Sequence, residues 1–206
     1  MAEPVRVLVV ESHRGLASVA ASTLEAAGHE VHRCFGPDDT GFPCVGMQGE
    51  PCPVQRGVDV VFLHRAGATA RPTPLEDGVL CALREGVPVV EARSSAVDPF
   101  GAYVTAWVDP TESPAEAVEA AARGRHEAVA AAVLDRIAPL VQHAGFTPAD
   151  VSCEVVREGD ALQVLLRTSR PVVALVAQSL AVRALDAVRT SGLARGQVGV
   201  HVLEAA

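Results

Sequence analysis

The sequence contains no lysine, because all 17 of its basic residues are arginine. This excludes a phosphate-binding loop of the Gly-Lys-Ser/Thr kind, a Schiff-base nucleophile and a kinase-type lysine. Aromatic residues are also scarce, at 3% against 49% hydrophobic residues overall, so the core must be built from Val, Leu and Ala. No apolar run approaches the length of a membrane span. These absences indicate a soluble protein without lysine-dependent chemistry.

Two further absences concern partners and compartment. The net charge of −8 provides no basic surface for nucleic acid. No charged stretch followed by an apolar segment opens the chain, since Arg6 already lies in the first apolar run, so we expect a cytoplasmic protein without a secretory signal. Cysteines stay reduced in that compartment, and the five cysteines are therefore better interpreted as metal ligands or redox groups than as disulfides.

The 206 residues are enough for two small domains, which we place at 1–111 and 112–206. In the first domain, short β-branched runs alternate with apolar residues at helical spacing, which predicts a parallel sheet of the α/β class. Glycines at 28 and 86 follow the two helical patterns and predict where those helices end. The expected strands are 5–10, 29–34, 58–64, 87–92 and 103–108.

Residues 5–110 contain three motifs: Asp59-Val-Val-Phe-Leu63 in the third expected strand, Val87-Pro-Val-Val90 in the fourth and Gly101-Ala102 before the fifth. In these motifs the segment resembles the receiver domain of two-component response regulators, with Asp59–Leu63 standing before the phosphoacceptor position. The resemblance implies a flavodoxin-like sheet with strand order 2-1-3-4-5. In that family, phosphorylation uses an aspartate after the third strand, Mg²⁺ on an acidic pair, a hydroxyl after the fourth strand and a lysine after the fifth.

This chain departs from the receiver pattern at nearly every one of those positions. His64 stands at the phosphoacceptor position, Glu11-Ser12 replaces the acidic pair, and Asp109 falls where lysine belongs. Arg93 or Ser94 lies near the hydroxyl position. The departures predict a pseudo-receiver, which does not act as an enzyme.

A cysteine-rich loop at 34–57 replaces the helix expected between the second and third strands. It carries Cys34, Cys44 and Cys52 in the spacing Cys-x9-Cys-x7-Cys, among glycines and prolines that oppose regular structure. We predict that these three thiolates bind an iron–sulfur cluster, most simply [4Fe-4S], with zinc or haem through the same cysteines as alternatives. Cys52-Pro53 resembles ferredoxin-type ligation. Idle thiols, or a disulfide plus one free thiol, are the alternatives without a metal.

The fourth ligand stays open. Cys34, His64 and Glu11 all end strands at the edge of the sheet where ligands bind in this class of fold. We therefore expect a metal at the former phosphorylation site, held by the three cysteines and His64. His13, His32 and Glu11 are the other candidates.

Two cysteines are left out of the predicted site. Cys81 falls in the second helical pattern and Cys153 in a strand of the second domain, and both are interpreted as small buried hydrophobic side chains. Four arginines of the first domain are expected to be solvated at its edge, or else to offset the charge of a thiolate-ligated cluster; they are Arg65, Arg71, Arg84 and Arg93.

Residues 112–206 predict a small α+β domain with the element order α-β-β-α-β. A capping box at Ser113-Pro-Ala-Glu116 begins the first helix, and Glu158-Gly159-Asp160 predicts a hairpin. No catalytic constellation is apparent, so we assign this domain to a protein partner or a homodimer. The whole chain is thus predicted to be a regulatory or redox-sensing protein that carries an iron–sulfur cluster. The alternative is a metal-free structural adaptor.

Overall fold

A computed structural model describes residues 4–36, 41–66, 71–92, 98–109, 111–193 and 197–204. The chain divides into two compact units, Met1–Arg123 and Gly124–Ala206. Helix α3 (Pro114–His143) runs across this division. The first turns of α3 bury Ala115, Val118 and Ala122 in the core of the first unit, and this is why the division falls later than the loop at 111–112 where we placed it from the sequence.

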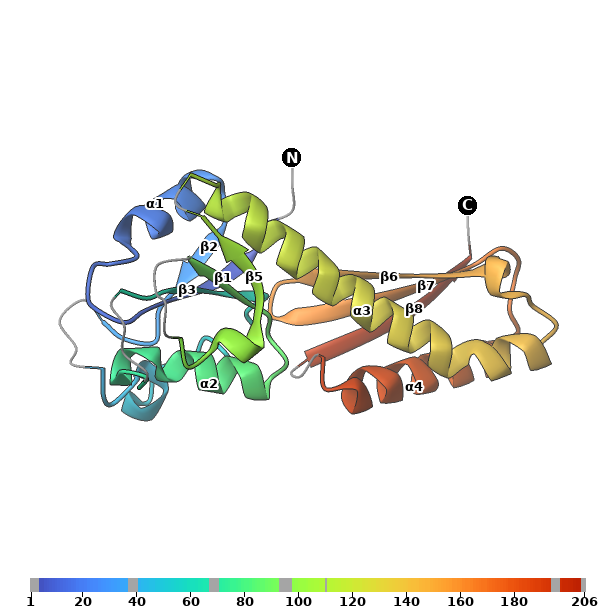
Figure 1. The fold of residues 1–206 in the computed structure, drawn as a ribbon. Helices are drawn as coiled ribbons and strands as arrows, with labels where there is room; N and C mark the ends of the chain where they lie inside the picture. The colour runs from blue at the N-terminus through green and yellow to red at the C-terminus, as the bar shows by residue number, and fades with distance from the viewer. Residues whose placement is uncertain are drawn as a thin grey trace. The chain divides into compact units, whose positions relative to one another are not determined.

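The first unit is built on a five-stranded parallel sheet in the order β2-β1-β3-β4-β5 (Figure 1). The predicted α/β class is confirmed, and the order is that of a flavodoxin-like or receiver-like fold. The second strand is shorter than the sequence indicated. The strands are β1 (Arg6–Glu11), β2 (Glu30–His32), β3 (Val60–His64), β4 (Val89–Ala92) and β5 (Val104–Val108).

Strand alternation gives this sheet two buried faces, because side chains of successive residues point in opposite directions. On β3, Val60 and Phe62 pack against helix α1 (Ser18–Ala26) and the start of α3; we call this the α1 face. Val61 and Leu63 pack on the other side with Val79 of helix α2 (Asp77–Arg84), which we call the α2 face. Figure 1 shows α1 and α2 on opposite sides of the sheet.

Short 3-10 segments complete the first unit. They are η1 (Val45–Gln48) in the cysteine-rich loop, η2 (Pro74–Glu76) before α2 and η3 (Gly101–Tyr103) before β5. The predicted ends of α1 and α2 are confirmed within a residue or two. Gly28 and Gly86 follow these helices with φ angles of 90° and 64°, a conformation that favours glycine and ends a helix.

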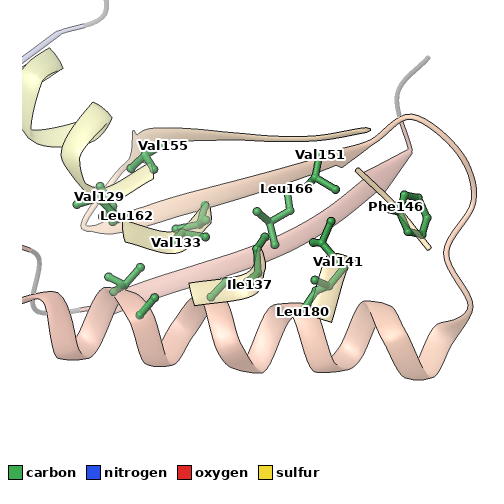
Figure 2. Packing of buried hydrophobic residues seen from close by; sticks show 14 residues of the cluster. Val129, Val133, Ile137, Val141, Phe146, Val151, Val155, Leu162, Leu166 and Leu180 are labelled. Atoms are coloured by element: carbon green, nitrogen blue, oxygen red, sulfur yellow. The ribbon is translucent and has the colours of Figure 1, made fainter. Parts of the chain in front are cut away.

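The second unit is a three-stranded sheet, β6-β7-β8, covered by the later turns of α3 and by α4. Strands β6 and β7 form the predicted antiparallel hairpin, and β8 pairs with β7 in parallel. Figure 2 shows the core between α3 (Val133, Ile137, Val141), the sheet (Leu166) and α4 (Leu180). The remaining elements are η4 (Pro148–Asp150), β6 (Val151–Glu158), β7 (Ala161–Thr168), α4 (Ala174–Ser191) and β8 (Gln197–Glu204).

Within the part of the chain that the structure describes, no helix has both the length and the hydropathy that a membrane crossing requires.

Candidate functional site

Cys34 follows β2 and is buried in the core of the α2 face. Its thiol lies against the first turn of α2, because a Cβ atom added to Gly78 would stand only 2.9 Å from the Cys34 Sγ atom. Glycine at this position therefore leaves room for the sulfur. The close packing of a helix over the end of β2 explains why a polarisable thiol, rather than a larger side chain, fits there.

The other two predicted ligands lie on the same face. The Val45 amide donates a hydrogen bond to the Cys34 carbonyl at 2.9 Å, which places Cys44 beside the end of β2. Cys52 packs against η1, since a Cβ atom added to Gly46 would lie 3.0 Å from the Cys52 Cβ atom. Both thiols are half-buried against the core that contains Cys34. The structure thus brings all three predicted cysteines onto the α2 face.

Cys81 joins this group, although we had interpreted it as a buried hydrophobic side chain. That interpretation is wrong, because Cys81 is exposed. It follows Gly78 by three residues on α2, close to one helical turn, so it stands one turn along from the Cys34 contact. Partial burial of its thiol raises the pKa of Cys81, and the neighbouring Cys52 and Cys44 raise this pKa further. The three-residue spacing between Gly78 and Cys81 is visible in the sequence. It points to Cys81 only once the contact of Cys34 with Gly78 is known.

The thiols of this group, Cys34, Cys44, Cys52 and Cys81, interact electrostatically. Burial raises the pKa of Cys34 to about 12, with further contributions from Cys52, Cys44 and Cys81. The Cys34 sulfur is therefore a neutral thiol at physiological pH. All five cysteines of the chain are free, so no disulfide takes up any of them.

No three His, Cys, Asp or Glu side chains within the described ranges are placed to hold a metal ion. A single zinc ion requires its ligands to meet at one point, with Zn–S bonds of about 2.3 Å, and the four thiols do not converge in this way. Ligation of an iron–sulfur cluster by Cys34, Cys44 and Cys52 therefore stays a prediction from the sequence.

His64 lies away from the cysteines. It continues the alternation of Val60 and Phe62 on β3, so its side chain belongs to the α1 face, whereas the cysteines lie on the α2 face. It lines a cavity on the α1 face. The structure therefore does not bring His64 to the three cysteines that we expected it to join.

The remaining candidates for a fourth ligand have other contacts. The Glu11 carboxylate accepts hydrogen bonds from the amides of Gly15 at 3.0 Å and Ala17 at 2.8 Å, which orders the loop before α1. His13 Nδ1 lies 2.9 Å from the Ser12 hydroxyl. His32 Nε2 lies 3.1 Å from a carboxylate oxygen of Glu30.

A buried charge network that we did not predict lies on the α2 face. Arg65 was expected to be solvated, yet its side chain is 1% exposed and donates to the carboxylate of Glu76, which is fully buried. A second contact joins Arg65 Nη1 to Asp98 Oδ1 at 3.5 Å. Arg71 and Arg84 are exposed, as expected, and Arg93 lies outside the described residues. A charged pair in a core gives no periodic signal, so the sequence pattern does not reveal it.

Glu91 on β4 completes this network. Its side chain is fully buried, and its carboxyl group interacts with that of Asp98. Burial raises the pKa of Glu91 to about 8, with Asp98 raising it further and Arg65 opposing. One guanidinium faces the carboxyl groups of Glu76, Asp98 and Glu91, so a proton on Glu91 reduces the uncompensated negative charge.

Comparison of the chain with protein-family models and with curated proteins finds no match. The case for a function therefore rests on the residues themselves.

Proposed function

We propose that this chain is a regulatory, redox-sensing protein whose receiver-like domain binds an iron–sulfur cluster through Cys34, Cys44 and Cys52. The single observation that supports this most is that Cys34 is buried in the core of the α2 face while Cys44 and Cys52 pack against that same core. Cys81 is the remaining cysteine of the first unit, and we assign it as the fourth ligand in place of His64.

The chemistry of the thiols supports a soft metal group. Burial and the neighbouring thiols raise the pKa of Cys34 to about 12, so Cys34 becomes a thiolate readily only when a cation compensates its charge. Thiolates favour zinc and iron–sulfur clusters over magnesium or calcium. The cluster is our first choice and zinc the alternative through the same cysteines.

The departures from the receiver pattern affect the phosphorylation residues and leave the sheet in place, which supports a receiver-like domain with a different input signal. The 2-1-3-4-5 sheet is present, but the chain lacks the acceptor aspartate at 64 and the lysine after the fifth strand. The end of β1, where the family binds Mg²⁺, instead uses Glu11 to order its own loop. We therefore assign the first unit as a pseudo-receiver whose input is a redox-sensitive cofactor instead of a phosphoryl group.

A second candidate function is a metal-free adaptor. It is favoured by the burial of Cys34 in the core, because a neutral thiol there is a stable small hydrophobic group. In either case the second unit is assigned to a protein partner or a homodimer. Val173, at the N-terminal end of α4, and Leu175 and Val182 on that helix are between 62% and 75% exposed, which is unusual for large apolar side chains.

Serine substitution with limited proteolysis distinguishes the two functions. The loop at 41–57 has few apolar residues to order it, so metal ligation should supply much of its stability. After anaerobic reconstitution with iron and sulfide, we expect wild type to resist cleavage in this loop. Cys34→Ser, Cys44→Ser and Cys52→Ser should each lose both the cofactor and the protection.

Cys153→Ser is the matched control, because Cys153 is a half-buried thiol of the second unit, on β6. It should behave as wild type. Equal protease resistance in all variants, with no bound iron, would leave the adaptor as the better account.

A further inference from the structure

The sheet of the second unit ends at two edge strands that differ in charge. In the order β6-β7-β8, both β6 and β8 pair with β7, and no described strand pairs with the outer edge of either (Figure 1). Proteins protect such edges with charged side chains, proline or a β-bulge, because the unpaired N–H and C=O groups invite another strand. β6 carries Glu154, Arg157 and Glu158 among its eight residues. β8 has no proline, and its one acidic or basic residue, Glu204, stands at its last position.

The backbone groups at the outer edge of β8 belong to three valines. The Thr168 hydroxyl of β7 donates a hydrogen bond to the Leu203 carbonyl of β8 at 3.3 Å, so this carbonyl points toward β7. The N–H and C=O groups of successive residues in a strand point to alternate edges. The backbone groups of Val198, Val200 and Val202 therefore point away from β7.

The side chains of the same valines carry the core of the second unit toward this edge. Val198, Val200 and Val202 are half-buried and pack against the core covered by α3 and α4. Gly199 and His201 alternate with them and lie on the opposite face of the sheet. A half-buried row of valines at an unpaired edge retains apolar surface that a further strand with the same pattern would bury.

We propose that two copies of this chain associate by antiparallel pairing of β8 with β8 of the second copy, about a two-fold axis at Val200. This register sets Val200 opposite Val200 of the second copy and Val198 opposite Val202. The three valine pairs exchange about six backbone hydrogen bonds. Gly199 falls opposite His201, so the imidazole stands beside a residue without a side chain.

The pattern of β8 selects this register. A shift by one residue would set the valines opposite side chains of the other face, and a shift by two would leave one valine of each copy without a valine opposite it. Glu204 lies outside the three pairs, so no like charges meet at the axis. A strand that complements itself in this way suits a two-fold interface, in which both copies use the same surface.

This inference rests on the part of the proposed function that assigns the second unit to protein association, and it selects a second copy as the partner. It uses none of the cysteines of the first unit. The cofactor and the dimer are therefore tested independently, and either can fail without the other.

Analytical ultracentrifugation of the full-length protein tests the dimer. We expect a dissociation constant of ~10 µM or tighter. Val200→Pro removes an N–H group that points away from β7, a position that tolerates proline, and it should weaken the dimer by at least ~10-fold. Far-UV circular dichroism checks that this variant is folded. A wild-type protein that is monomeric at ~100 µM, or a folded Val200→Pro variant that dimerises as tightly as wild type, overturns the proposal.

A cysteine at the axis gives a second test that does not require Val200→Pro to fold. The Cα atoms of a hydrogen-bonded antiparallel pair lie ~5.5 Å apart, which is within the range for a disulfide. On mild oxidation, Val200→Cys should form a disulfide between the two introduced thiols, identified by mass spectrometry of the linked peptides. Val156→Cys is the matched control, because Val156 is a half-buried valine on the other edge strand, and it should not form one. A dimer in which Val200→Cys forms no such disulfide would place the interface elsewhere and refute the proposal.

Discussion

Glu91 makes the stability of the first unit depend on pH in a direction that can be worked out in advance. Its pKa is about 8 in the folded protein, against an ordinary value of 4.5. Between these values the folded state keeps a proton that the unfolded state has released. The free energy of unfolding therefore falls as pH rises from about 4.5 to about 8, and the contribution of Glu91 is constant above that range.

The size of this effect follows from the difference between the two pKa values. A difference from 4.5 to about 8 corresponds to at most about 5 kcal/mol, at about 1.4 kcal/mol for each pH unit. Glu91→Gln removes the titration and keeps the shape of the side chain, so this component of the pH dependence should vanish. The variant should therefore gain stability relative to wild type as pH rises from 5 to 9.

Trp107 provides the assay, because it is the only tryptophan in the chain and lies on β5 of the parallel sheet. Urea unfolding followed by its fluorescence, at several pH values, gives the free energy of unfolding of the first unit. Glu25→Gln, at an exposed position of α1, is the control and should keep the wild-type profile. If the profiles of Glu91→Gln and wild type run parallel from pH 5 to 9, the assignment of a proton to Glu91 is refuted.

Two further outcomes follow from the same structure. Gly78→Ala should destabilise the first unit by about 1–3 kcal/mol in the same urea assay, because its Cβ atom would stand 2.9 Å from the Cys34 sulfur. Gly124→Ala on α3, whose Cβ atom would meet nothing within 4 Å, should instead stabilise the protein by up to ~1 kcal/mol. Equal effects of the two substitutions would contradict the packing of Cys34. Acetyl phosphate with Mg²⁺ should not phosphorylate the protein, since His64 replaces the acceptor aspartate and the chain has no lysine, and an acid-labile gain of one phosphoryl group in the intact mass would count against the pseudo-receiver assignment.

The sheet and its helices could be predicted because their signals are local. β-branched runs such as Val7–Val10 mark buried strands, and glycine at 28 and 86 marks the helix ends. The division between the units could not be predicted in the same way. The alanine-rich start of α3 packs on the first unit, and an alanine stripe has the same pattern whichever core it joins.

The candidate site could be predicted only in part, because its members depend on which face of the sheet each side chain enters. Cys34, Cys44 and Cys52 lie close together in the sequence, and in the structure they belong to or pack against the same hydrophobic core. The place of Cys81 one helical turn from the Cys34 contact depends on the packing of Cys34 on Gly78, and the place of His64 on the α1 face depends on the phase of β3. Both are tertiary facts that spacing alone does not contain.

The iron and acid-labile sulfide content of protein purified without oxygen tests the central claim most directly. We predict about four of each per chain, with broad absorption near ~400 nm that disappears in Cys34→Ser and persists in Cys153→Ser. A colourless protein with about one zinc per chain would keep a metal site but reject the cluster. A colourless and metal-free protein, as stable as its cysteine variants, would contradict the account.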